Sequence, residues 1–328
     1  MNALAEKRLS ATALFSAPSV ADELVLVDGI TRAGKMLMAK LVSAFERIDF
    51  FQYQPVLEHI PILSRIGVMD AANAATYWRL SAGMATLDRA AGRNLNLRIG
   101  DSSSIDNAPD ADRYLSRSRE ADFDGLLARF QGEGRVPAFL THETLPHAAL
   151  VFAAAPKTRF VEVERNLVDL AYSWYRRGWG TRFGADAKAL VPVLDVAGYP
   201  VPWFAAGFAE TFGQSYTAMS PADRCAASIL ALYREGEGAM ARLSPAQRKQ
   251  VHWVRYEDLL RDPRRALEGV GAFLGGKPLP GMDAILVREG LTGASPPKSS
   301  RVALREVVSA GLADRLDAAA EEQFKRVH

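Results

Sequence analysis

The sequence predicts an α/β fold, with a mostly parallel central sheet flanked by helices. Short β-like runs alternate with helical patterns along most of the 328 residues. The first run, "ELVLV" (23–27), leads through a glycine-containing loop into a helical pattern. The chain is 48% hydrophobic, which is enough to bury a substantial core. Strands separated by helices form right-handed units, and these give parallel sheets.

The spacing of apolar residues assigns the individual elements. We expect strands at 23–27, 48–53, 96–99, 137–142, 159–164 and 250–256. We expect helices at 36–47, 73–91, 122–131, 144–154, 167–177, 221–243, 264–274 and 313–326.

Two regions fit this alternation poorly, residues 55–135 and residues 178–220. Ligands in open α/β sheets bind at the carboxyl ends of the strands, where inserted segments cover them. We therefore expect a single domain spanning residues 1–328, in which both regions are insertions that cover the acceptor side of a site.

Composition excludes several classes of protein. The net charge of +2 gives no overall field that would attract nucleic acid or an anionic membrane. The single cysteine, Cys225, excludes an internal disulfide and favours a buried thiol in a reducing compartment. No run of about 18 apolar residues predicts a membrane span. The N-terminal "LSATALFSAPSVA" loosely resembles a signal peptide, but polar residues and Pro18 interrupt it, so we expect a cytoplasmic protein.

The loop after the first strand has the features of an anion site. Residues Gly29 to Lys35 fit the pattern G-x-x-x-x-G-K, in which backbone N–H groups at a helix start bind phosphate oxygens. Arg32 and Lys35 add two cations. Position 36 is Met, where a magnesium-dependent ATPase or GTPase has Ser or Thr. An ordinary glycine turn remains the alternative to an anion site here.

Three further positions could carry chemistry. Arg165 at a strand end and Ser173 two helical turns later could reach a second anionic group, although a capped helix with a solvated arginine has the same pattern. His142, at the end of another strand, could act as a general base or could simply pack. Tyr256 could stack on a nucleotide base or could belong to the core.

Taken together and in this order, the motifs resemble the sulfotransferase family, whose members transfer a sulfuryl group from 3′-phosphoadenosine 5′-phosphosulfate to a hydroxyl or amine. The resemblance runs from residue 24 to about residue 305. It implies that the loop "TRAGKM" grips the 5′-phosphosulfate through Arg32, Ala33, Gly34, Lys35 and Met36. The stretch "RNLVDLAYS" (165–173) matches the family's 3′-phosphate motif in full, which implies that Arg165 and Ser173 hold that phosphate.

The same resemblance supplies candidates for the base. Thr141-His142 is similar to the family's Thr-His, which implies that His142 takes the proton of the acceptor. Carbohydrate-acting members often use a glutamate soon after the first helix, and Glu58 lies where such a residue would fall. We rank His142 first and Glu58 second, with His59 and Glu143 behind them.

The C-terminal part matches the family less fully. "RYEDLLRDP" resembles the late strand and turn whose tyrosine lies near the adenine, which implies this role for Tyr256. Members often close a basic, glycine-containing loop over the 3′-phosphate. "VREGLTG" (287–293), with Arg288 and Gly290, and "KSSR" (298–301) are both partial candidates.

The resemblance also predicts the reaction. Sulfuryl transfer requires no metal, because the migrating group carries less charge than a phosphoryl group, so Met36 is no anomaly. Aromatic residues and arginines alternate in "SWYRRGWGTRFG" (173–184), which favours a carbohydrate or another small hydroxylated metabolite as acceptor. The alternative is that these side chains pack the insertion and solvate its rim. The alternatives are a P-loop phosphotransferase that uses ATP and a non-catalytic nucleotide-binding protein of the same fold. The sequence sets no oligomeric state.

Overall fold

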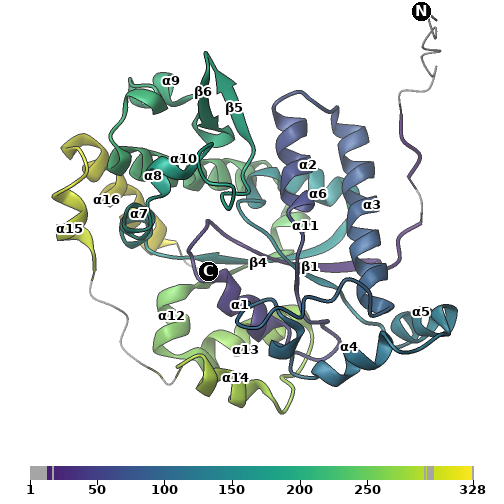
Figure 1. The fold of residues 1–328 in the computed structure, drawn as a ribbon. Coiled ribbons are helices and arrows are strands. Elements are labelled where there is room, and N and C mark those ends of the chain that lie inside the picture. Colours follow the sequence, from purple (N-terminus) through teal and green to yellow (C-terminus); the bar gives the residue numbers. More distant parts are fainter. Residues whose placement is uncertain (1–12, 17, 292, 294–298, 327–328) are drawn as a thin grey trace, which may run out of the picture.

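The computed structural model describes residues 13–16, 18–291, 293 and 299–326, and a five-stranded sheet forms its centre (Figure 1). The strands are β1 (Glu23–Asp28), β2 (Gln52–Tyr53), β3 (Ala138–Leu140), β4 (Lys157–Glu164) and β7 (Val251–Arg255). Their order across the sheet is β2-β3-β1-β4-β7, and every neighbouring pair is parallel. All five carboxyl ends therefore meet at one edge of the sheet.

Helices cover both faces of the sheet because side chains alternate along each strand. Val25 and Val27 of β1 pack with one set of helices, and Leu24 and Leu26 pack with the opposite set. Figure 1 shows the first set below the sheet: α1 (Lys35–Val42), α12 (Tyr256–Arg261), α13 (Pro263–Leu274) and α14 (Met282–Arg288). Above it lie α2 (Val56–Arg65), α3 (Ala71–Ala90), α6 (Ala148–Ala154) and α10 (Pro221–Arg242).

The other elements surround this centre. The α-helices are α4 (Ala111–Arg117), α5 (Phe123–Gly132), α7 (Leu167–Arg176), α8 (Trp179–Arg182), α9 (Phe208–Phe212), α11 (Pro245–Arg248), α15 (Arg301–Arg305) and α16 (Ala310–Lys325). A hairpin is formed by β5 (Val193–Val196) and β6 (Tyr199–Pro202). Four 3₁₀ turns complete the described elements: η1 (Ile105–Asn107), η2 (Leu145–His147), η3 (Trp203–Ala205) and η4 (Tyr216–Ala218).

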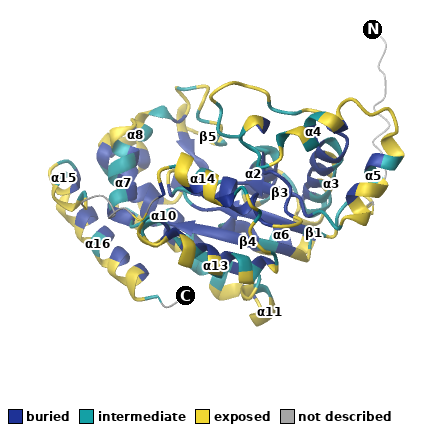
Figure 2. Cartoon of the chain, turned by 90° about the horizontal axis from the view of Figure 1, so that it is seen from below, coloured by how far each residue is buried: buried dark blue, intermediate teal, exposed yellow. Residues whose placement is uncertain are grey.

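The sheet and the inner sides of its helices form the buried interior (Figure 2). Trp78 of α3 is fully buried, and its indole nitrogen donates to the carbonyl of Leu57 at 2.9 Å, which holds α3 against α2. Cys225 is buried within α10, as the sequence predicted. None of the described helices is both long and apolar enough to cross a bilayer.

The predicted fold class, an α/β protein with a mostly parallel sheet, is confirmed, and five of the six predicted strands are present with shifted ends. The strand predicted at 96–99 is wrong. Asn94 has a left-handed φ of 50°, and the side chain of Asn96 accepts from the backbone of Arg98 at 3.0 Å. These local turns use polar backbone groups that a strand would pair with a neighbour.

The helix predicted at 36–47 ends earlier, at Val42. The hydroxyl of Ser43 donates to the carbonyl of Ala39 at 2.7 Å and accepts from the backbone of Phe51 at 3.0 Å, so the chain turns here. Residues 1–12 and 17 of the N-terminal segment that loosely resembles a signal peptide lie outside the described residues.

Candidate active site

The loop between β1 and α1, residues 29–34, depends on two glycines. Gly29 has φ 144°, and a Cβ atom there would lie 2.3 Å from the carbonyl oxygen of Val163. Gly34 has φ 108°, and its Cβ would lie 2.4 Å from the ring of Tyr256. No side chain among the described residues caps the first turn of α1. Leu37, in that turn, donates its N–H to the carbonyl of Gly34 at 3.1 Å. The N–H groups of Lys35 and Met36 have no such backbone partner among the described residues and could bind an anion.

Three arginines from three elements converge beside this loop. Arg32 lies in the loop itself, Arg165 follows β4, and Arg177 follows α7. Burial lowers the pKa of Arg32, and the charges of Arg177 and Arg165 lower it further. Arg165 donates to the backbone oxygen of Arg32 at 3.3 Å, and its guanidinium lies 5.3 Å from the ring centre of Tyr256. We call Arg32, Arg165 and Arg177 the arginine cluster.

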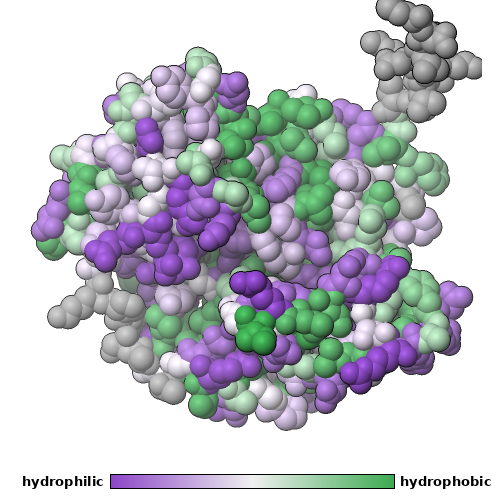
Figure 3. Space-filling view, in the orientation of Figure 1, coloured by the Kyte–Doolittle hydropathy of each residue, from purple (hydrophilic) through white to green (hydrophobic). Residues whose placement is uncertain are grey.

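In the part of the chain that the structure describes, no carboxylate contacts the arginine cluster directly. Within the described part of the chain none of its three members forms an ion pair, although the charge of Glu257 acts on Arg165 from further away. Arginine keeps its charge at any physiological pH. Hydrophilic side chains gather over α7 and α8, on the same side of the molecule (Figure 3). A bound anion would relieve the repulsion within the cluster.

A cavity of about 530 Å³ opens beside the arginine cluster, at the carboxyl ends of β1 and β3. The loop, the start of α1 and Tyr256 form one wall. Both predicted insertions contribute to the remaining walls, with Glu58 and Ser102 from the first and Trp179, Lys188, Leu190 and Val191 from the second. The cavity is large enough for a nucleotide-sized ligand.

The two highest-ranked base candidates, His142 and Glu58, contact each other in this cavity. Nδ1 of His142 lies 2.7 Å from Oε1 of Glu58, and the edge of the Tyr53 ring packs against the imidazole. Burial lowers the pKa of His142 well below 6.5, and the charge of Lys35 adds to this effect. Burial raises the pKa of Glu58 well above 4.5, and the charge of Glu143 adds to it. The site therefore favours a neutral imidazole, which is the form that can accept a proton.

The third base candidate, His59, has a different contact. Its Nε2 lies 2.8 Å from the carbonyl oxygen of Leu190. His59 thus connects α2 to the second insertion, and Leu190 in turn lines the cavity.

Asp28 anchors the segment that carries His142. Its carboxylate is fully buried at the end of β1 and accepts from the hydroxyl of Thr141 at 2.9 Å. It also accepts from the backbone N–H groups of Thr144 at 2.8 Å and Leu145 at 2.7 Å. The "THETL" segment is therefore fixed to the strand that leads into the loop.

Lys35 points inward rather than away from the loop. Its side chain is buried, and its ammonium donates to the carbonyl of Gly29. Burial raises the pKa values of Asp28 and Glu162, and the positive charge of Lys35 lowers both and so opposes this effect. Lys35 also lines the cavity, so this residue contributes both to the loop and to the site.

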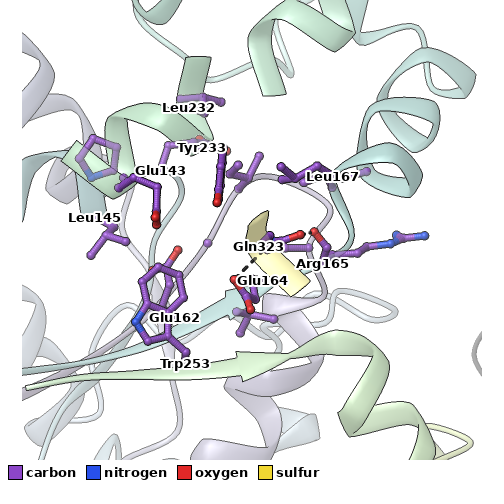
Figure 4. Close-up of a pocket in the computed structure, with 18 residues that line it drawn as sticks. Glu143, Leu145, Glu162, Glu164, Arg165, Leu167, Leu232, Tyr233, Trp253 and Gln323 are labelled. Carbon is purple, nitrogen blue, oxygen red and sulfur yellow. Dashed lines mark hydrogen bonds between the residues drawn. The ribbon is translucent and has the colours of Figure 1, made fainter. Parts of the chain in front are cut away.

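A second hollow, of about 40 Å³, lies behind the loop on the α10 side of the sheet. Figure 4 shows Glu143, Glu162 and Tyr233 around it. Glu162 is 6% exposed, and its Oε2 has no hydrogen-bond partner among the described residues. Burial raises the pKa of Glu162 well above 4.5, and the charge of its strand neighbour Asp28 and a hydrogen bond with Asp28 raise it further. Glu162 therefore keeps its proton at pH values where an exposed glutamate is ionised.

Several residues predicted to bind the donor lie off the cavity wall. Ser173 is half-buried on α7, and Ala33 is a buried residue of the loop itself. Arg288 is exposed at the end of α14 and contacts Glu289, which does line the cavity. Gly290 is exposed, with a left-handed φ of 70°.

The second C-terminal candidate, "KSSR", reaches the predicted 3′-phosphate helix. The backbone N–H of Ser300 donates to a carboxylate oxygen of Asp169 at 2.6 Å. Lys298 and Thr292 of the two C-terminal candidates lie outside the described residues.

The position of Arg177 in the arginine cluster was not predicted. From the sequence, the stretch that contains Arg177 was expected to contact the acceptor. Several arginines alternate with aromatic residues in 173–184, and their spacing alone does not show which arginine side chain lies near the loop. The signal that could have found it is its position at the end of the helix that begins just after Arg165.

Residues 25–287 match the family model of the sulfotransferase domain. The chain therefore belongs to the sulfotransferase family, and it is a sulfotransferase that transfers a sulfuryl group. No protein in a comparison with curated sequences matches it.

Solved structures of sulfotransferases are similar to the chain at low identity. The sulfotransferase domain of the olefin synthase from Synechococcus PCC 7002 is 11% identical, with a TM-score of 0.47 over 97% of this chain and 100% of that one. The sulfotransferase domain from the curacin biosynthetic pathway is 11% identical, with a TM-score of 0.46 over 96% and 100%. A sulfotransferase from Alicyclobacillus acidocaldarius is 17% identical, with a TM-score of 0.42 over 94% and 98%.

The proton held by Glu162 gives a prediction about stability. An unfolded glutamate ionises near pH 4.5, whereas folded Glu162 resists ionisation, so its contribution is complete at low pH and is lost as pH rises. Glu162→Gln resembles the protonated side chain. Between pH 5 and pH 8, the free energy of unfolding should fall further in the wild type than in the variant. We expect the two decreases to differ by about 1 kcal/mol or more. Urea unfolding at both pH values measures this difference.

The exposed Glu268→Gln on α13 is the matched control and should follow the wild type at both pH values. A wild type and a Glu162→Gln variant with parallel pH dependence would contradict a protonated Glu162.

Proposed function

We propose that the chain transfers the sulfuryl group of 3′-phosphoadenosine 5′-phosphosulfate to a hydroxyl of a carbohydrate or another small hydroxylated metabolite. The observation that carries this proposal is the arginine cluster. It lies at a helix start that has no side-chain cap, and no carboxylate of the described residues contacts it. The donor carries a phosphate at the 3′ position and a phosphosulfate at the 5′ position of its ribose, and the cluster offers cations to both.

The donor would lie along the wall that the loop and Tyr256 form. The N–H groups at the start of α1 and the guanidinium of Arg32 would hold the phosphosulfate. Arg165 and Ser173 would hold the 3′-phosphate, and Arg177 would add charge between the two. Tyr256 covers Gly34 and stacks with Arg165, which suits a place beside the adenine.

The transfer would be in-line. Nε2 of neutral His142 takes the proton of the acceptor hydroxyl while the hydroxyl oxygen attacks sulfur. The bond between sulfur and the bridging oxygen of the bisphosphate breaks, and Arg32 stabilises the charge that develops on that oxygen. For Nε2 to take this proton, Nδ1 of His142 carries the hydrogen and donates it to ionised Glu58, which orients the imidazole and stabilises it when it is protonated. A base placed in this way contributes about 10²–10⁴-fold to the rate.

The acceptor would enter between the two insertions. Trp179, Leu190 and Val191 offer apolar surface, and Tyr53 and Lys188 offer polar groups. This mixture suits a ring with several hydroxyls. A cytoplasmic location and a single domain with insertions at 55–135 and 178–220 stay predictions.

Calorimetric titration tests the donor. We expect 3′,5′-adenosine bisphosphate to bind, and Arg165→Ala to weaken that binding by at least about tenfold because a charged hydrogen-bond donor is lost. Arg176→Ala, at an exposed neighbouring position on α7, is the control and should bind as the wild type does. Preference for ATP with magnesium over the bisphosphate would reject the proposal and favour a phosphotransferase.

The pH dependence of turnover tests the base. Because the pKa of His142 lies well below 6.5, we expect turnover to persist as the pH falls through 6.5 and to decline only in more acidic solution. His142→Ala should lower kcat about 10²–10⁴-fold while bisphosphate binding stays within about threefold. Release of the bisphosphate from the sulfated donor, followed with a panel of hydroxylated acceptors, measures both. A decline centred at or above pH 6.5 would argue against this histidine as the base.

A further inference from the structure

The donor loop is held in place by groups from outside it. The carbonyl of Thr31 accepts from the indole nitrogen of Trp174 at 2.6 Å. The carbonyl of Arg32 accepts from Arg165 at 3.3 Å. Two of the loop's peptide groups therefore face α7 and the end of β4, and the loop cannot shift without breaking these two hydrogen bonds.

Glu143 holds the same loop from behind. Its carboxylate accepts from the backbone N–H of Thr31 at 2.5 Å and also bonds the hydroxyl of that residue. Its own backbone N–H donates to the carbonyl of Gly29 at 3.2 Å. Glu143 is 7% exposed and has a left-handed φ of 52°. A non-glycine residue keeps such a conformation only when its surroundings impose it.

The direction of this carboxyl group argues against a role as the base. His142 and Glu58 line the large cavity, whereas Glu143 lines the small hollow behind the loop (Figure 4). An acceptor in the large cavity would meet the imidazole of His142 and would have the loop between itself and Glu143.

We propose that Glu143 is a positioning residue of the donor loop, which fixes Thr31 and thereby sets where Arg32 meets the donor. This inference rests on the proposed function in one respect, namely that the loop binds the donor. Glu143 accepts from the N–H of Thr31 and Trp174 donates to its carbonyl, so both peptide groups that flank Thr31 are hydrogen-bonded. Arg32 follows Thr31 directly and has a left-handed φ of 77°. This conformation is unfavourable for a residue other than glycine, so the loop needs outside contacts to keep it.

Two substitutions at one position separate the possible roles of Glu143. Glu143→Gln keeps an oxygen that can accept from Thr31, so we expect bisphosphate binding, kcat and the pH profile within about threefold of the wild type. Glu143→Ala removes the acceptor, and we expect it to weaken bisphosphate binding by about tenfold or more. Calorimetry and donor turnover measure these effects, and urea unfolding measures stability in parallel.

Each other result contradicts the inference. A loss of kcat of about 10²-fold or more in Glu143→Gln, with binding unchanged, would make Glu143 a base. Lower stability in Glu143→Ala, with unchanged binding by the folded protein, would make its role purely structural.

A second readout does not depend on the nucleotide. The indole N–H resonance of Trp174, assigned through its absence in Trp174→Phe, reports on the hydrogen bond to Thr31. The chemical shift of this resonance should change in Glu143→Ala and stay the same in Glu143→Gln. An unchanged chemical shift in both variants would overturn the inference. If Glu143→Ala does not fold, Thr31→Val, which loses only the hydroxyl contact, should move the same resonance. A wild type that binds no bisphosphate would reject the donor assignment and leave this resonance test of Glu143 intact.

Discussion

The repulsion among Arg32, Arg165 and Arg177 is the constraint around which the site is built. Each guanidinium comes from a different part of the chain, and the parallel sheet gathers them because the carboxyl ends of its strands share one edge. Arg177 and Arg165 each lower the pKa of Arg32, so the three positive charges repel one another, and among the described residues no carboxylate contacts them. Under the proposed function, a ligand with two separated anionic groups would offset this repulsion.

Holding like charges close together requires a rigid support. The loop meets this need through Gly29 and Gly34, whose positions leave no room for a Cβ atom. Lys35 supplies an internal ammonium that satisfies the carbonyl of Gly29, and Asp28 ties the "THETL" segment to the same strand. These contacts connect the loop, the segment that carries His142 and the start of α1.

The sequence predicted the parts of the site that are local in the chain. The loop "TRAGKM", the capped helix start after Arg165 and the position of His142 at a strand end were all readable from spacing. The contact between His142 and Glu58 was not, because it joins residues 84 apart and depends on how α2 packs beside β3. The hairpin β5–β6 was missed for a related reason, since its strands pair only with each other and carry exposed apolar residues without clear alternation. The strand predicted at 96–99 failed because asparagine side chains satisfied its backbone locally.

The account is tested most directly by thermal unfolding of the wild type and Arg32→Ala, each with and without 3′,5′-adenosine bisphosphate. Without ligand, removal of one of three like charges should leave the midpoint unchanged or raise it by about 2 °C or more. With ligand, the midpoint of the wild type should rise and that of the variant should not. Arg176→Ala, outside the arginine cluster, should behave as the wild type in both conditions. A variant that is less stable without ligand and shows the same ligand-induced rise as the wild type would contradict the central role of the arginine cluster.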